Sequence, residues 1–290
     1  MTGFLQDVLN GLTLGLVYAA FALGLSLVLG ILGIINVAHS ALLVLAALVY
    51  YELVNGAGVD LLLAAVPTLV LFFLLGMGMQ RTLVRRVERE PDTTALLVFF
   101  GAMVAIESVA IMVWTTDTRN VRLGYLDHTL RLAGLNLPVA RLVAGVTTLV
   151  LFAAVHLFLT RTLTGAAIRG LAQNRDVVEM LGVPVRRLAM VVFGGGAALA
   201  AYGGVVLGLT LPFSPQEHVR WLAWAFLVVI VGGLGNVAST LLAGLAVGLV
   251  ESFTGSYLAF QYTYLVIYLL LAVALLLRRE GLRGTATRTL

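Results

Sequence analysis

Residues 222–277 decide the fold of this chain: LAWAFLVVIVGGLGNVASTLLAGLAVGLVESFTGSYLAFQYTYLVIYLLLAVALLL. These 56 residues contain one charged side chain, that of Glu251. A helix crosses a bilayer with about 20 apolar residues, so the segment is long enough for more than one crossing. Breaks at 232–236 (GGLGN) and 254–256 (TGS) leave two readings: two long helices, or three crossings of which one is short or re-entrant.

The remainder of the 290 residues has the same character. Apolar residues make up 61% of the chain, charged residues only 11%, and the mean hydropathy is +1.05. So few polar residues cannot cover the surface of a soluble domain. Further apolar segments lie at about 8–30, 38–54, 61–80, 94–115, 139–160 and 188–210. We therefore expect an all-α polytopic membrane protein, a bundle of about 8–10 transmembrane helices in which residues 1–290 form one transmembrane domain.

Cysteine and lysine are both absent, and all 18 basic residues are arginine. Disulfides and thiolate metal sites are thereby excluded, and so is an ATP-binding P-loop, which needs a lysine. No two histidines have metal-ligand spacing, so we expect no metal, no catalytic residue and no cofactor in this chain. The net charge of +4 describes how arginine is distributed around a bilayer, and we expect no nucleic-acid partner.

Arginine placement predicts an orientation. The segments 81–93 and 161–187 are strongly basic, and cytoplasmic loops of membrane proteins carry such an excess. We expect both segments in the cytoplasm and the N terminus outside. A cytoplasmic location of the basic tail after residue 277 then requires an odd number of crossings beyond residue 220, which favours three crossings there and nine in all. The segment 116–138 runs against this pattern, because it also carries arginine while lying outside.

The basic segment 161–187 mixes polar and apolar residues in a way that predicts two short helices. The first spans about 165–173, with Ile168 and Leu171 on one face and Arg169 on another. Such a helix pair can offer a docking surface to a soluble partner, or it can lie on the membrane surface with no partner.

The second short helix has recognisable end signals. Asp176 is expected to cap it, with Glu179 three residues later completing a capping-box-like pair, and Gly182 is expected to end it. Val178 and Leu181 are expected to share one side.

Three motifs resemble those of the permease subunits of branched-chain amino acid ABC importers. They are residues 33–39 (GIINVAH), the loop 165–183 followed by Arg187, and residues 231–236 (VGGLGN) with Gly244, Gly248 and Glu251 downstream. Their order and spacing match over essentially the whole chain. The resemblance implies a multi-pass permease of a prokaryotic cytoplasmic (inner) membrane for branched-chain or other hydrophobic amino acids.

The resemblance also implies partners. Cytoplasmic ATPase subunits would hold ATP and Mg²⁺ and dock on the 161–187 loop, and an extracytoplasmic solute-binding protein would deliver the solute. A second, homologous permease is expected, as a heterodimer in preference to a homodimer. The expected ATPase-coupling residues are Gly165, Ile168, Arg169, Leu171, Asn174, Arg175, Asp176, Glu179, Leu181 and Gly182.

Two positions depart from the family pattern. Ser40 stands where the family often has glycine, and Trp224 where it often has lysine. If the lysine lines the translocation path in relatives, tryptophan at position 224 is expected to change the solute preference of this protein.

Polar residues at membrane depth are candidates for the translocation path, because an ionisable group there is costly unless it is paired or hydrated. Glu107 and Glu251 are such groups, and Asn36, His39 and Asn236 lie at helix breaks. Each has a structural alternative: pairing for the carboxylates and satisfaction of freed backbone groups for the others. Small residues at four-residue intervals predict close helix packing, most clearly Gly196, Ala200, Gly204 and Gly208.

Other functions remain open from the sequence. The same architecture serves urea or short amides, sugars and nucleosides in related permeases. A proton-coupled secondary transporter using Glu107 or Glu251 is a less favoured alternative. An intramembrane enzyme is disfavoured, because the sequence contains no convincing metal motif or Ser/His/Asp set.

Overall fold

The computed structural model describes residues 2–87, 92–121, 126, 128–132 and 134–277. The α-helices are α1 (Thr2–Leu32), α2 (His39–Tyr51), α3 (Leu61–Met79), α4 (Arg85–Val87), α5 (Asp92–Trp114), α6 (Val139–Arg161), α7 (Leu163–Gln173), α8 (Arg175–Met180), α9 (Val185–Thr210), α10 (His218–Gly232), α11 (Val237–Tyr257) and α12 (Thr263–Leu277). Two π-helical turns, η1 (Glu52–Gly56) and η2 (Gln80–Val84), continue α2 and α3, and two 3₁₀ turns, η3 (Pro215–Glu217) and η4 (Phe260–Tyr262), precede α10 and α12.

The expectation of an all-α polytopic membrane protein is confirmed. Seven helical segments of the described chain are long and apolar enough to cross a membrane: Gly3–Leu32, His39–Gly56, Leu61–Val87, Thr93–Trp114, Val139–Arg161, Val185–Thr210 and Val237–Tyr257. The block 222–277 forms three helices, α10, α11 and α12, of which only α11 is among these seven. Helices α10 and α12 have 15 residues each. Counting α12 with the seven gives eight, and counting α10 as well gives nine, so the predicted count of about 8–10 depends on these shorter helices.

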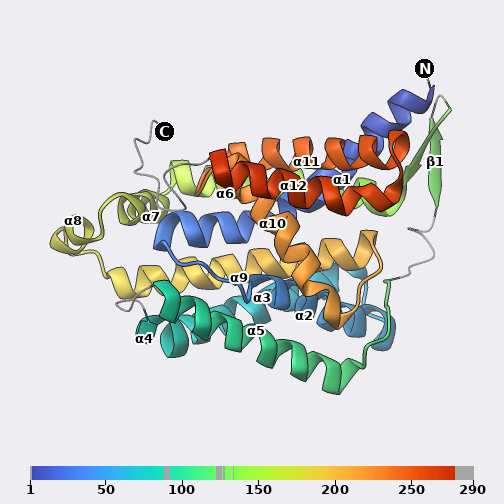
Figure 1. Cartoon of the computed structure of the whole chain (residues 1–290). Helices are drawn as coiled ribbons and strands as arrows, with labels where there is room; N and C mark the ends of the chain where they lie inside the picture. Colours follow the sequence, from blue (N-terminus) through green and yellow to red (C-terminus); the bar gives the residue numbers. More distant parts are fainter. Residues whose placement is uncertain (1, 88–91, 122–125, 127, 133, 278–290) are drawn as a thin grey trace.

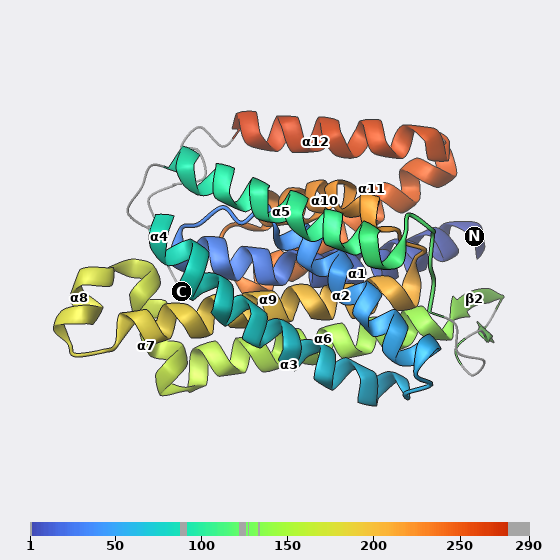
Figure 2. The same cartoon turned by 90° about the horizontal axis from the view of Figure 1, so that it is seen from below.

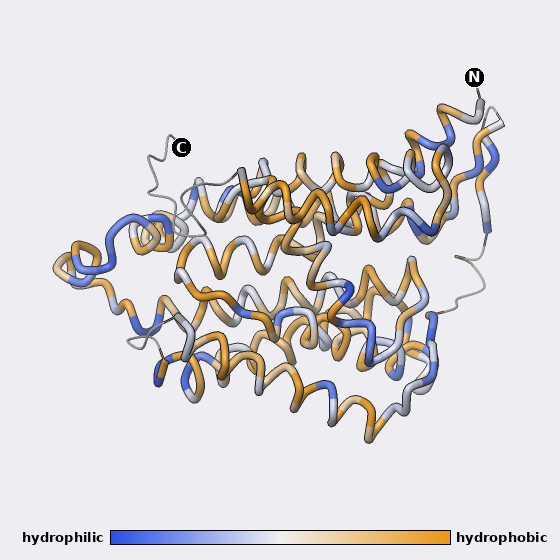
Figure 3. Tube along the Cα trace, viewed as in Figure 1, coloured by the Kyte–Doolittle hydropathy of each residue, from blue (hydrophilic) through white to orange (hydrophobic). Residues whose placement is uncertain are grey.

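The long helices run side by side as one bundle (Figures 1 and 2). The short helices α7 and α8 project from one end, which we call the hairpin end, and the start of α1 lies at the opposite end (Figure 1). Hydrophobic residues cover the length of the bundle, whereas hydrophilic ones gather toward its ends and on the α7–α8 hairpin (Figure 3). The distribution is that of a chain that crosses a bilayer along the bundle axis.

Helix α1 forms the centre of the bundle and packs against α9, α10 and α11. Its contact with α11 is made by glycine on both sides, because Gly11 and Gly15 face Gly248 and Gly244. A Cβ atom built on Gly15 would lie 2.6 Å from the Cα atom of Leu245. The two backbones therefore meet with no room for a side chain between them, as expected where lipid supplies no hydrophobic drive for helix association.

The predicted small-residue stripe lies on α9, which is largely buried. Gly196 faces α1, close to Gly24, and Gly204 faces α2, where a Cβ atom would lie 2.8 Å from the Ala47 nitrogen. Ala200 is fully buried. Gly208 has more room, because its nearest neighbour would lie 3.3 Å from an added Cβ.

Two irregular segments interrupt the helices inside the bundle. After α1 ends at the hairpin end, residues 33–38 return to the middle of the bundle, where α2 begins (Figure 1). The second break separates α10 from α11, where Gly233 (φ 85°) and Gly235 (φ 75°) have left-handed backbones that favour glycine. The other break predicted in 222–277, at residues 254–256, lies slightly later, between the end of α11 and the start of η4. Helix α11 continues to Tyr257, and the Ser256 hydroxyl donates to Asp7 Oδ1 (2.7 Å).

A small antiparallel hairpin lies at the end of the bundle opposite α7–α8. Its strands are β1 (Thr129–Leu132) and β2 (Leu135–Pro138). The Gln6 side chain of α1 joins its edge, donating to the Asn136 carbonyl (2.9 Å) and accepting from the Asn136 amide (2.8 Å). The segment 116–138 thus contains the only β-sheet among the described residues.

The glycine contact between α1 and α11 gives a first prediction. Gly15→Ala should lower the free energy of unfolding by about 1–3 kcal/mol, because the added methyl group overlaps backbone that cannot move aside. Gly101→Ala in α5 is the matched control, since nothing lies within 4 Å of a Cβ there. It should be neutral or stabilising by up to about 1 kcal/mol. Thermal denaturation of the purified variants in detergent measures both, and equal effects would contradict the packing argument.

Candidate functional site

Helix α7 leaves the bundle by a tight return after α6. It begins at Leu163, slightly before the predicted start, and Thr162 caps it by accepting a hydrogen bond from the Gly165 amide (2.9 Å). Gly165 lies directly against the end of α6, so that a Cβ atom would be 2.7 Å from the Cα atom of Leu159. The return therefore depends on glycine at this position.

Helix α8 is capped by Asn174, and the prediction of Asp176 as the cap is wrong. The Asn174 Oδ1 atom accepts from the amides of Asp176 (3.0 Å) and Val177 (3.2 Å). Asn174 has the extended backbone of an N-cap residue, whereas Asp176 already lies in the first helical turn, where its charge suits the helix dipole. Gly182 follows the helix with a left-handed backbone (φ 79°), as the sequence predicts.

The inner face of the α7–α8 hairpin packs on the bundle. Ile168 and Leu171 of α7 form a buried cluster with Val178 of α8 and with residues of α9, among them Leu188. Arg169 lies on a different face, half-buried, with its Nη1 atom unpartnered among the described residues. The hairpin is thus attached to α9 by apolar packing and is not a free loop.

The tip of the hairpin exposes large apolar side chains. Met180 is 85% exposed and Leu181 76% exposed, and Val177 beside them is half exposed. The expectation that Leu181 shares a side with the buried Val178 is wrong, because α8 ends at Met180 and Leu181 is its C-cap.

Charged residues flank this apolar tip. Asp176 and Glu179 are exposed on α8, as is Arg175 at its start. An apolar groove of about 330 Å³ runs along the base of the hairpin. It is lined by Leu163, Thr164, Ala167, Val183, Pro184, Arg187, Leu188 and Val191. The hairpin therefore offers a mixed apolar and charged surface outside the apolar length of the bundle.

Glu251 lies buried in α11 and has partners on two other helices. Trp224 of α10 donates from Nε1 to Glu251 Oε2 (2.8 Å). The hydroxyl of Tyr18, on α1, is hydrogen-bonded to the same carboxyl group. Trp224 is thus a neutral donor to a buried acid.

An arginine stacked among aromatic rings lies next to this pair. The Arg220 guanidinium carbon is 4.5 Å from the ring centre of Trp221, 4.9 Å from that of Tyr264 and 5.6 Å from that of Trp224. Such stacking stabilises a partly buried cation. Sequence reasoning missed Tyr18 and Arg220 as members of this cluster. The close spacing of Arg220, Trp221 and Trp224 in the sequence could have indicated that the arginine stacks on these rings.

Glu107 has its partner on a different helix. Its Oε2 atom lies 3.9 Å from the Nε2 atom of His218, which is buried at the start of α10. His218 is the first residue of α10, and Glu107 lies in the interior of α5. Glu107 and Glu251 therefore belong to separate polar clusters, and each finds a partner on another helix.

The polar residues at the helix breaks satisfy backbone groups or remain unpartnered. His39 contacts the carbonyl of Phe21 through Nε2 (3.0 Å), and Asn236 caps α11 by accepting from the Ser239 amide (3.0 Å). Asn36 is 2% exposed, and its Oδ1 atom has no hydrogen-bond partner among the described residues.

Metal chemistry has no candidate in the part of the chain that the structure describes. Within it, no group of three or more acidic or histidine side chains could hold a metal ion.

The Trp224–Glu251 bond gives a prediction with an internal control. Trp224→Phe should lower the free energy of unfolding by about 1.5–3 kcal/mol more than Trp221→Phe, because it removes a hydrogen bond to a buried acid. Trp221 lies one turn away with the same burial, but its Nε1 atom has no partner among the described residues. Thermal denaturation of both purified variants is the measurement. Equal losses would mean that only ring volume matters.

The chain matches known transport proteins over nearly its full length. The family described as "Branched-chain amino acid transport system / permease component" matches residues 8–275. The high-affinity branched-chain amino acid transport system permease protein LivH of Escherichia coli K12 is 28% identical, over 97% of this chain and 96% of the relative. The corresponding protein BraD of Pseudomonas aeruginosa is 25% identical with the same coverage.

A relative with a different solute in its name is also similar. The fructose import permease protein FruG of Bifidobacterium longum is 24% identical, over 85% of this chain and 75% of the relative. No solved structure is significantly similar to the chain. Because the family match covers most of the sequence, the chain belongs to the family of branched-chain amino acid transport system permease components.

Proposed function

We propose that this chain is the membrane-spanning subunit of an ATP-driven importer for branched-chain or other hydrophobic amino acids. ATP and Mg²⁺ would be bound by partner ATPase subunits, since the sequence has no lysine for a P-loop. The observation that carries the proposal is the α7–α8 hairpin, an ordered helix pair outside the bundle with exposed apolar side chains, in a chain of this family. Exposed apolar patches on ordered elements are typical of protein-binding surfaces.

The packing of the hairpin on two helices of the bundle would transmit a displacement of its tip to the bundle. Its inner face packs on α9 through Ile168 and Leu171, and its start lies against α6 through Gly165. Helix α9 in turn contacts α1, α2 and α3. A push on the tip by an ATPase would therefore reach the central helices through packed side chains, without any flexible connection.

The proposed orientation places the hairpin end in the cytoplasm and the N terminus outside. The basic residues Arg81, Arg85, Arg175 and Arg186 support it, because all four line one cavity at the hairpin end. In this orientation the β1–β2 hairpin faces the solute-binding protein. A second homologous permease, in a heterodimer, would complete the path, and Glu251 and Glu107 are candidates to line it.

Docking on the tip predicts a selective loss of the ATPase. Leu181→Asp should lower co-purification of the ATPase subunit with the permease about 10-fold or more, because a charge would replace an apolar contact at the centre of the interface. Affinity purification from solubilised membranes, with the ATPase quantified by immunoblot, measures it.

Two further variants sharpen this test. Leu130→Asp, an exposed apolar position in β1 at the opposite end, is the matched control and should leave the ATPase bound. Asp176→Arg tests the charged flank and is preferable to a change at Arg169, whose half-buried side chain also supports the fold. Unchanged co-purification and unchanged uptake in both hairpin variants would contradict the docking proposal.

The solute and the energy source are tested by uptake. Cells expressing the complete transporter should take up labelled leucine, and uptake should stop when ATP is depleted and persist when the proton gradient is collapsed. The relative FruG gives fructose as the second candidate solute. Uptake of fructose without leucine would favour that candidate. Uptake that survives ATP depletion but fails without a proton gradient would favour a secondary transporter with Glu107 or Glu251 as the proton carrier.

A further inference from the structure

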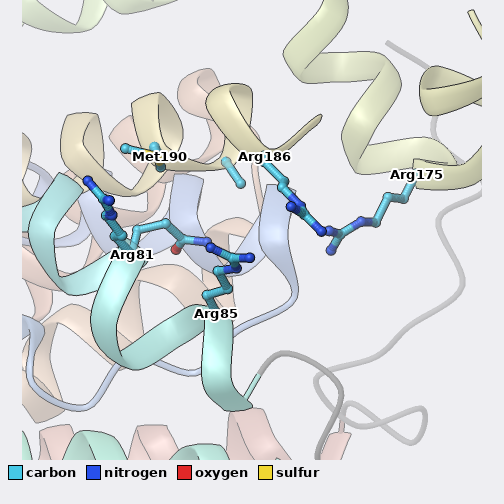
Figure 4. A pocket seen from close by; sticks show the side chains of 7 residues that line it. Arg81, Arg85, Arg175, Arg186 and Met190 are labelled. Carbon is cyan, nitrogen blue, oxygen red and sulfur yellow. The ribbon is translucent and has the colours of Figure 1, made fainter. Parts of the chain in front are cut away.

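A cavity of about 250 Å³ lies at the hairpin end, where the end of α3 approaches α8 and α9. Figure 4 shows four arginines that surround it. Its lining residues are Gln80, Arg81, Arg85, Arg175, Arg186, Ala189 and Met190. The cavity is distinct from the apolar groove at the base of the hairpin and from the exposed tip.

Among the described residues that line this cavity, every charged side chain is an arginine. Arg175 and Arg186 extend toward one another from α8 and α9, and Arg85 reaches toward them from α4 (Figure 4). No acidic side chain of the described chain lines the cavity. Arg81, Arg85 and Arg186 form no ion pair with another described residue. Like charges brought together in this way favour an anion between them.

Gln80 adds an independent observation. It is 4% exposed, lines the cavity, and its Oε1 atom has no hydrogen-bond partner among the described residues. A buried amide oxygen without a donor is costly, so a ligand that carries a hydroxyl group fits this position. Gln80 opens the π-helical turn η2, a type of helical irregularity that occurs often at functional sites.

The position of the cavity distinguishes a lipid from a free anion. Turn η2 directly follows the apolar helix α3, so the cavity lies where a membrane-spanning segment ends. Val70, Leu71 and Leu74 on α3 are about half exposed and offer an apolar track for an acyl chain. Ala189 and Met190 provide an apolar wall beside the arginines.

We propose that this cavity binds the headgroup of an anionic, hydroxyl-bearing phospholipid, with phosphate held by the arginines and a headgroup hydroxyl donating to Gln80. Phosphatidylglycerol has this chemistry. A bound headgroup would join Arg175 of the hairpin to Arg85 and Arg186 of the bundle, so anionic lipid would fix the hairpin in its docking position. The proposal does not depend on which solute is transported.

Native mass spectrometry of the purified full-length permease, titrated with phosphatidylglycerol and with phosphatidylcholine, tests the proposal. The wild type should retain phosphatidylglycerol in preference to phosphatidylcholine. The double variant Arg85→Gln/Arg186→Gln should lose about 25-fold in that preference, since each arginine that contacts the bound headgroup in this cavity contributes roughly a factor of five toward an anionic lipid. Arg85→Lys/Arg186→Lys should keep most of it, because lysine also binds phosphate as a point charge.

Arg187→Gln is the matched control. Arg187 follows Arg186 on α9 and lines the apolar groove instead of this cavity, so its loss should change the preference less than twofold. An equal loss in this control would show general attraction to charge and overturn the proposal. So would an unchanged preference in the double variant, or displacement of the lipid by millimolar inorganic phosphate, which would indicate a free-anion site. Loss of the ATPase subunit without any change in lipid retention would instead assign the cavity to a protein partner.

Discussion

The glycine-to-glycine contact between α1 and α11 is the constraint on which the rest of the bundle depends. In a bilayer the helices gain little from burying apolar surface, so their association relies on close backbone packing. Gly11 and Gly15 allow that approach to α11, and Gly24 allows it to α9. Helix α1 thus lies at the centre, with α9, α10 and α11 packed around it. Helix α9 in turn carries the packing surface for the α7–α8 hairpin.

Dense packing leaves polar groups inside the bundle that must be satisfied locally. Glu251 is bound by Trp224 and Tyr18, and His39 contacts the carbonyl of Phe21. These contacts join α1 to α10, α11 and α2, so the polar residues at membrane depth hold the same helices together as the glycines do. Trp224 supplies a neutral donor, so the buried acid is hydrogen-bonded without a second buried charge beside it.

The sequence predicted those features that depend on local pattern. The apolar segments, the helix pair in 161–187 and the glycine break near residue 233 all follow from composition and spacing. Contacts between distant segments could not be predicted, because the Trp224–Glu251 bond depends on how α10 turns back on α11. The N-cap of α8 was predicted wrongly, because Asn174 and Asp176 are both favourable N-cap residues. Only the backbone conformation decides between them.

The central claim is that the α7–α8 hairpin is a cytoplasmic docking element, and labelling of one cysteine tests it most directly. The chain contains no cysteine, so Met180→Cys introduces a unique thiol at the exposed tip. A membrane-impermeant maleimide should label it in inverted vesicles but not in intact spheroplasts, and co-expression of the ATPase should protect it. Labelling from the outside, or labelling that the ATPase leaves unchanged, would contradict the account.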